Sequence, residues 1–172
     1  MQTNYGTSVT PFYTTLALWV GGIVLVALMK VKVDYEDDEF KDATEHQKYI
    51  GRALLFLAMG QLQALVVVLG DLYILKIDCT HPFMLWLAAA ITSFVFTLFI
   101  YTLVLTFGDL GKAIAVVMIV LQIAGSGGTY PIELLPEFFQ NVYLYFPFPY
   151  AINAMREAIS GLYQCDYAVF LV

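Results

Sequence analysis

Long runs of uncharged, apolar residues dominate this sequence, and the first charged side chain along it is Lys30. Of the 172 residues, 60% are hydrophobic and 13% are charged, whereas soluble domains contain about 45–50% apolar and about 25% charged residues. This composition excludes an ordinary soluble enzyme, a disordered chain and a basic nucleic-acid-binding protein. We therefore expect an integral membrane protein of the all-α class.

Four of the apolar runs are long enough to form transmembrane helices, which need about 20 residues to cross ~30 Å of hydrocarbon. We expect a single transmembrane domain over residues 1–172, a polytopic helical bundle with about four complete spans. The expected spans are residues 12–29, 53–75, 83–107 and 113–124. Pro11 and Pro82 precede two of them, and proline is tolerated at the start of a helix. From about residue 167 the chain is apolar again, which we interpret as the start of a truncated fifth span.

The basic residues predict the orientation of the chain in the cell membrane. Lys and Arg in short loops set the orientation, and acidic residues contribute little. Six of the eight basic residues lie on one side, namely Lys30, Lys32, Lys41, Lys48, Arg52 and Lys112. The loop 30–52 is therefore predicted to be cytoplasmic, with the N-terminus of this chain outside. Within the loop, Thr44 and Gln47 have the spacing of a capping box, which predicts a helix beginning near Glu45.

The segment 125–161 combines glycines, prolines and aromatic residues in a way that a simple transmembrane helix would not. Each proline removes a backbone donor, and glycine permits backbone conformations that other residues avoid. We expect a re-entrant or interfacial helical hairpin on the outer side, with an aromatic belt; the alternative is an outer loop resting on lipid headgroups. Its candidate structural or functional residues are Gly125, Gly127, Gly128, Pro131, Pro136, Arg156 and Glu157.

Polar residues within the apolar runs are further candidates, because an unpaired charge in hydrocarbon is costly. Asp71 comes late in the second run, so we expect it at the outer interface. Gln61, Gln63 and Gln122 lie deeper, and we expect them to form hydrogen bonds between helices. Arg156 could pair with Glu133, Glu137 or Asp71 and so fix the hairpin, or Arg156 and Glu157 could simply reach water at the headgroups.

The sequence lacks the motifs of a catalytic or metal-binding site. It has no H-E-x-x-H, no G-x-S-x-G and no Cys/His cluster with metal-ligand spacing. The segment 106–113 comes nearest to a phosphate-binding loop, but Thr106 replaces its first glycine and Ala113 replaces its Ser or Thr. We expect a tight turn there, no enzyme activity and no cofactor, so that ATP-driven work would need a separate ATPase. Cys79 and Cys165 both fall on the predicted outer side, and the sequence does not decide whether they pair.

Several segments, in order along nearly the whole chain, resemble one known family of membrane proteins. The most specific is the stretch Gly125 to Pro131, Gly-Ser-Gly-Gly-Thr-Tyr-Pro. The others are residues 4–6, 11–12, 16–21, 63–71, 107–113, 147–152 and 155–161, with the rest of 122–136 and residues 138–139. On these segments the sequence resembles the C-terminal membrane region of the YhgE/Pip (phage infection protein) family.

This resemblance implies a helical bundle similar to ABC-2-type permease domains, within a longer Gram-positive cell-membrane protein that also has a first span, an extracellular region and a last span. The implied function is the transporter-like region of a cell-surface phage receptor, with a candidate link to protein export. The alternative is a permease subunit of an ABC-type exporter that works with a separate ATPase. Candidate partners are membrane lipid, a second copy in a homodimer, a phage protein on the outer side, and an ATPase or secretion component, with no nucleic acid. The family supplies no catalytic residues.

Overall fold

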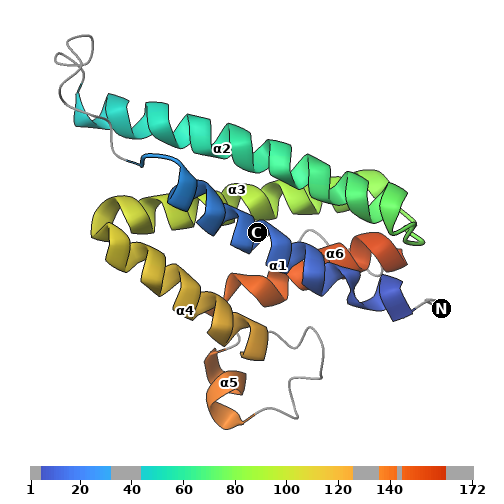
Figure 1. Ribbon diagram of the computed structural model, residues 1–172. Helices are drawn as coiled ribbons and strands as arrows, with labels where there is room; N and C mark the ends of the chain where they lie inside the picture. Colours follow the sequence, from blue (N-terminus) through green and yellow to red (C-terminus); the bar gives the residue numbers. More distant parts are fainter. Residues whose placement is uncertain (1–4, 32–43, 126–135, 143–144, 162–172) are drawn as a thin grey trace.

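The computed structural model describes residues 5–31, 44–125, 136–142 and 145–161, and within these ranges all regular structure is helical. In chain order the helices are α1 (Tyr5–Leu28), α2 (Glu45–Leu69), the π-helix η2 (Gly70–Ile74), α3 (Pro82–Phe107), α4 (Asp109–Gly125), α5 (Glu137–Val142) and α6 (Pro147–Ser160). Figure 1 shows α1, α2 and α3 running along one another, with α6 against α1 and α3 and with α4 leading to α5. We call the end of the bundle near Met29 and Gly108 the turn end, and the end near Thr80 the Thr80 end.

Three helical segments are long and apolar enough to cross a membrane: Gly6–Leu28, His46–Ile74 and Pro82–Phe107. They correspond to the first three expected spans, so the expectation of a membrane-spanning helical bundle is confirmed for these helices. The fourth expected span corresponds to α4, which has 17 residues. At 1.5 Å per residue, α4 is about 25 Å long, less than the ~30 Å of a hydrocarbon core. A fourth complete span therefore stays a prediction.

Helix boundaries follow the local signals of the sequence at three places. The capping box at Thr44 is present: its hydroxyl accepts a hydrogen bond from the Gln47 amide at 3.4 Å, and its own amide donates to the Gln47 side chain at 3.0 Å. Pro82 occupies the first turn of α3. Gly108, with φ of 62°, forms the tight turn between α3 and α4, a conformation in which glycine has no steric penalty.

The starts of two helices differ from the sequence-based expectation. The first helix begins at Tyr5 instead of residue 12, so Pro11 lies inside α1. Helix-breaking prolines are tolerated in membrane helices where other groups compensate, and near Pro11 the Thr10 hydroxyl donates to the carbonyl of Gly6 at 2.8 Å. The fourth helix begins at Asp109 instead of residue 113. An acidic residue in the first turn interacts favourably with the helix dipole.

The core of the bundle is built from α1, α2, α3 and α6, with a smaller part from α4, and its largest buried side chains are aromatic. Trp19, Phe96, Phe148, Tyr101 and Phe56 are all buried almost completely. In contrast, one face of α2 exposes apolar residues, among them Leu54, Leu62 and Val66. Exposed apolar side chains on a spanning helix contact lipid in a membrane.

Several predictions fall on residues that lie outside the described part of the chain. These are the conformations at Gly127, Gly128 and Pro131, the span from about residue 167, and the pairing of Cys79 with Cys165. Most of the loop 30–52 is also outside it. The described part of the hairpin contains two short helices, α5 and α6, as the proline pattern predicted.

Candidate functional site

An aromatic cluster holds the start of α6 against the middle of the bundle. The Phe148 ring stacks on Phe96 with centroids 5.4 Å apart, and it meets the Trp19 indole edge-on at 5.6 Å. Trp19 and Phe96 are themselves in edge contact at 4.9 Å. Both residues lie near the midpoints of their helices, α1 and α3. The first turn of α6 is therefore at the level of the middle of these spans.

The indole N–H of Trp19 connects this cluster to α4. It donates a hydrogen bond to the backbone carbonyl of Ala115 at 3.2 Å. A buried indole normally needs such a partner, and here the acceptor comes from a fourth helix. The cluster thus joins α1, α3, α4 and α6 at one level of the bundle.

The other end of α6 is fixed to the connection between η2 and α3. The amides of Thr80 and His81 donate to the carbonyls of Ile159 and Ala158, each at 3.2 Å, and the Thr80 hydroxyl adds a bond to Ile159 at 3.0 Å. The last carbonyls of a helix have no partner within the helix, so this connection caps α6. Consequently α6 extends from the middle of α1 and α3 to the Thr80 end (Figure 1).

The thiol of Cys79 belongs to the same connection. It donates to the Ala158 carbonyl at 3.6 Å. Burial raises the pKa of this thiol, and a hydrogen bond with the His81 backbone offsets part of the rise. The thiol is therefore less ionised than an exposed cysteine at the same pH.

Two glutamines that we expected to join helices do so. The Gln63 side chain of α2 donates to the Ala17 carbonyl of α1, and Gln61 donates to the Ala90 carbonyl of α3, both at 3.0 Å. The buried hydroxyl of Ser93 adds a bond to the Gly60 carbonyl at 2.7 Å. Gln122 differs: its side chain is completely buried, and no hydrogen-bond partner lies within the described residues.

The expected level of Asp71 at the outer interface stays a prediction. Within the bundle its side chain is buried, with 7% of its surface exposed. The reason is a partner on α1: the Thr14 hydroxyl donates to the carboxylate at 2.6 Å. In the described part of the chain, the hydrogen bond to this carboxylate therefore comes from Thr14 and not from Arg156, which is exposed on α6.

The other predicted residues that the structure describes are not brought together into one site. Gly125 is buried at the end of α4, Pro136 is exposed just before α5, and Glu157 is half-buried on α6. The aromatic cluster was not among the predicted site residues. Its rings come from segments far apart in sequence, and an aromatic residue in an apolar run carries no signal of its partner.

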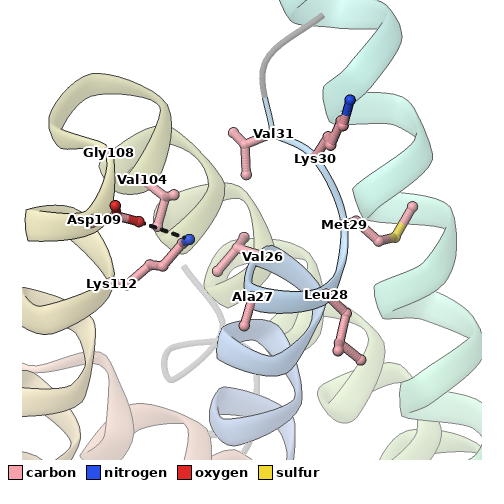
Figure 2. Close-up of a pocket in the computed structure, with 10 residues that line it drawn as sticks. All are labelled: Val26, Ala27, Leu28, Met29, Lys30, Val31, Val104, Gly108, Asp109 and Lys112. Atoms are coloured by element: carbon pink, nitrogen blue, oxygen red, sulfur yellow. Dashed lines mark hydrogen bonds and ion pairs between the residues drawn. The ribbon is translucent and has the colours of Figure 1, made fainter.

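A cavity opens at the turn end, between the last turn of α1 and the α3–α4 turn, with a volume of about 370 Å³ (Figure 2). Figure 2 shows Lys112 and Asp109 joined on one rim and Lys30 on the other; the ion pair on the first rim is 3.0 Å long. Val26 and Val104 are among the apolar residues that line the cavity. No group of three or more metal-ligating side chains occurs in the described ranges.

Comparison with known proteins gives a family and one similar relative. Residues 46–169 match the family described as "ABC-2 family transporter protein". The chain is 32% identical over 158 residues to "Uncharacterized protein YhgE" of Bacillus subtilis (strain 168). That match covers 92% of this chain and 20% of the relative, so the chain spans about one fifth of the length of YhgE. No solved structure matches the chain.

Proposed function

Because the chain belongs to the ABC-2 transporter family, we propose that it forms the membrane domain of an exporter-type transporter that a separate ATPase drives. The observation that carries this proposal is the family match over residues 46–169, which includes the helices from α2 to α6. The segment nearest to a phosphate-binding loop, residues 106–113, forms the end of α3, the turn at Gly108 and the start of α4. In this proposal the energy of ATP hydrolysis comes from the separate ATPase.

In this proposal the turn end is cytoplasmic, and it is where the ATPase docks. Lys112 and the basic residues of the loop 30–52 support this orientation. The docking surface consists of that loop together with the cavity in Figure 2, whose rims carry Lys30 and the Asp109–Lys112 pair. Apolar residues such as Val26 and Val104 share the lining of this cavity with the charged residues of the rims, and apolar residues surrounded by polar ones are typical of a protein–protein interface.

We further propose that α6 is a re-entrant helix rather than an interfacial one. The contacts of Phe148 with Trp19 and Phe96 support this choice, because these two residues lie near the midpoints of spanning helices. A helix resting on the headgroups would meet α1 and α3 only near their ends. Phe148 and Pro149 in the first turn of α6 are buried. At its other end, the carbonyls of Ala158 and Ile159 accept hydrogen bonds from the connection to α3, and backbone at membrane depth requires such partners within the protein.

The test of the ATPase proposal is purification of the full-length protein from its native membranes in mild detergent, followed by measurement of ATP hydrolysis and of the co-purifying subunits. We expect a stoichiometric ATPase subunit. Lys112→Glu should reduce its recovery, because it reverses a charge at the proposed docking surface. Lys76→Glu, which reverses an exposed charge near the Thr80 end, is the matched control. Absence of any ATPase subunit from the wild-type preparation would contradict the proposal.

A phage receptor is the second candidate function, and it rests on the resemblance of the sequence to the phage infection protein family. Phage adsorption to cells that make the full-length protein tests it. If the receptor role needs only the outer surface, Lys112→Glu cells should adsorb phage normally although the ATPase is lost. Unchanged adsorption by cells that lack the protein would rule the role out.

A further inference from the structure

Asp71 is the one charged residue between Arg52 and Lys76, and neither α1 nor α3 contains Asp, Glu, Lys, Arg or His. A charged side chain within spanning helices is expensive and is a candidate functional site by default. The carboxylate is also withdrawn into the bundle, since Asp71 is 7% exposed. The family match does not account for this residue, because membership of a transporter family assigns no role to a single carboxylate.

The contact with Thr14 can persist whether the Asp71 side chain is ionised or protonated. Thr14 is itself buried, and its hydroxyl donates to the Asp71 carboxylate at 2.6 Å. A threonine hydroxyl is both a donor and an acceptor. When the carboxylate binds a proton, a new O–H bond forms at the carboxyl group, and the hydroxyl can accept that O–H in place of donating. The pair therefore stays hydrogen-bonded in both states without repacking α1.

The backbone at this position is irregular. Asp71 lies in η2, a single stretch of π-helix that follows α2 directly. This turn ends the second spanning segment, before the connection to α3, and π-helical turns are rare in proteins. Within η2 the side chains of Tyr73 and Ile74 are exposed while Asp71 is buried, so the turn directs the one carboxylate toward α1.

The other titratable groups around this site are at its periphery. On α1 the nearest in sequence is Tyr13, which is exposed, and on η2 it is Tyr73, also exposed. The connection to α3 carries Lys76, Asp78 and His81, all exposed, together with the half-buried Cys79. α6 carries Arg156, which is exposed, and Glu157, which is half-buried. Within the described residues no salt bridge joins any of these groups to Asp71.

We propose that Asp71 and Thr14 form a proton-binding site near the Thr80 end of the bundle. The oxygen atoms at this site favour a proton over a metal cation. The site has one carboxylate and one hydroxyl, whereas a calcium ion takes about six to eight oxygen ligands. The described ranges also hold no cluster of metal-ligating side chains. The proton comes from water on that side, and no other bond forms or breaks.

Infrared spectroscopy of the full-length protein in phosphatidylglycerol–phosphatidylethanolamine vesicles tests this site. We expect the carbonyl-stretching band of a protonated carboxylic acid to disappear as the pH is raised. The band should be lost in Asp71→Asn and retained in Asp109→Asn, whose carboxylate is exposed at the other end of the bundle. Persistence of the same titrating band in Asp71→Asn would overturn the proposal.

Two further measurements keep the test decisive if Asp71→Asn does not fold. Thr14→Val removes the hydrogen-bonding hydroxyl, so it should shift the frequency of the band, whereas Thr14→Ser should keep the wild-type frequency. An unshifted band in Thr14→Val would contradict the assignment to this pair. The titration is also repeated with sodium replaced by choline: an unchanged titration supports a proton site, and a titration that depends on sodium identifies a sodium site and overturns ours.

Discussion

The ring of Phe148 meets the indole of Trp19 edge-on, with centroids 5.6 Å apart and planes at 76°, although the two residues come from opposite ends of the described chain. Phe148 begins the helix α6, and Trp19 lies in the middle of α1. This contact places the start of α6 at depth within the bundle. Edge-to-face aromatic pairs of this geometry contribute about 0.5–1.5 kcal/mol beyond the burial of their area.

Phe148→Ala should therefore destabilise the protein strongly. The ring is completely buried, and Phe→Ala changes in cores cost roughly 3–5 kcal/mol. Thermal unfolding in detergent measures the effect as a lowered midpoint. The control is Phe83→Ala, because Phe83 is mostly exposed at the start of α3. Equal midpoints for the two variants would contradict the proposed importance of the aromatic cluster.

Local signals along the chain predicted several helix boundaries but not the contacts between helices. The capping box at Thr44, the proline at position 82 and Gly108 act on backbone within a few residues, so their effect can be predicted from spacing alone. The partner of Asp71 is different. Thr14 is one of several threonines in α1, and only tertiary packing decides which one reaches the carboxylate.

For the same reason, the sequence indicated the membrane class and short helices in the hairpin, but not the depth of α6. An apolar, proline-rich segment is compatible with either an interfacial or a re-entrant position. The contacts of Phe148 support the re-entrant position that we propose, because they come from the middle of other helices. The apolar run of α4 did not predict where this helix begins. The run starts at residue 113, whereas the helix starts at Asp109.

Two glycines of α2 should respond oppositely to alanine. At Gly60 a methyl group would lie 2.5 Å from the Thr97 hydroxyl and 3.2 Å from that of Ser93, whereas at Gly51 nothing lies within 4 Å. Alanine stabilises an open helix position by about 1 kcal/mol relative to glycine. Gly51→Ala should raise the unfolding midpoint and Gly60→Ala should lower it. A rise in both variants would show that α2 and α3 are not in close contact at Gly60.

The orientation of the chain predicts which engineered cysteines react from outside the cell. In a variant with Cys79 and Cys165 replaced by serine, a membrane-impermeant thiol reagent should label Asp78→Cys on whole cells and should not label Asp109→Cys. Both positions are exposed, so accessibility within the protein does not differ. Labelling of Asp109→Cys on whole cells, without labelling of Asp78→Cys, would reverse the proposed orientation.

The native thiol of Cys79 should react slowly with alkylating reagents. Its reaction rate should rise at a higher pH than the rate of an exposed thiol. Burial raises its pKa, and the thiolate is the reactive form, so at a given pH a smaller fraction can react. The measurement is the alkylation rate against pH in a Cys165→Ser variant, compared with Asp78→Cys in a chain without native cysteines. Coinciding profiles for the two thiols would contradict the burial of Cys79 beneath α6.

The depth of α6 in the bilayer tests the re-entrant arrangement most directly. In a background with Cys79 and Cys165 replaced by serine, which keeps Trp19, a thiol-reactive fluorophore is attached to a cysteine at Tyr150, which is partly exposed in the first turn of α6, or at Phe83 near the Thr80 end. Lipids brominated at different depths of their chains then quench the fluorescence. We predict that the label at position 150 is quenched most by the deepest bromines, and the label at position 83 by those nearest the headgroups. Equal, shallow depths for both positions would contradict the account.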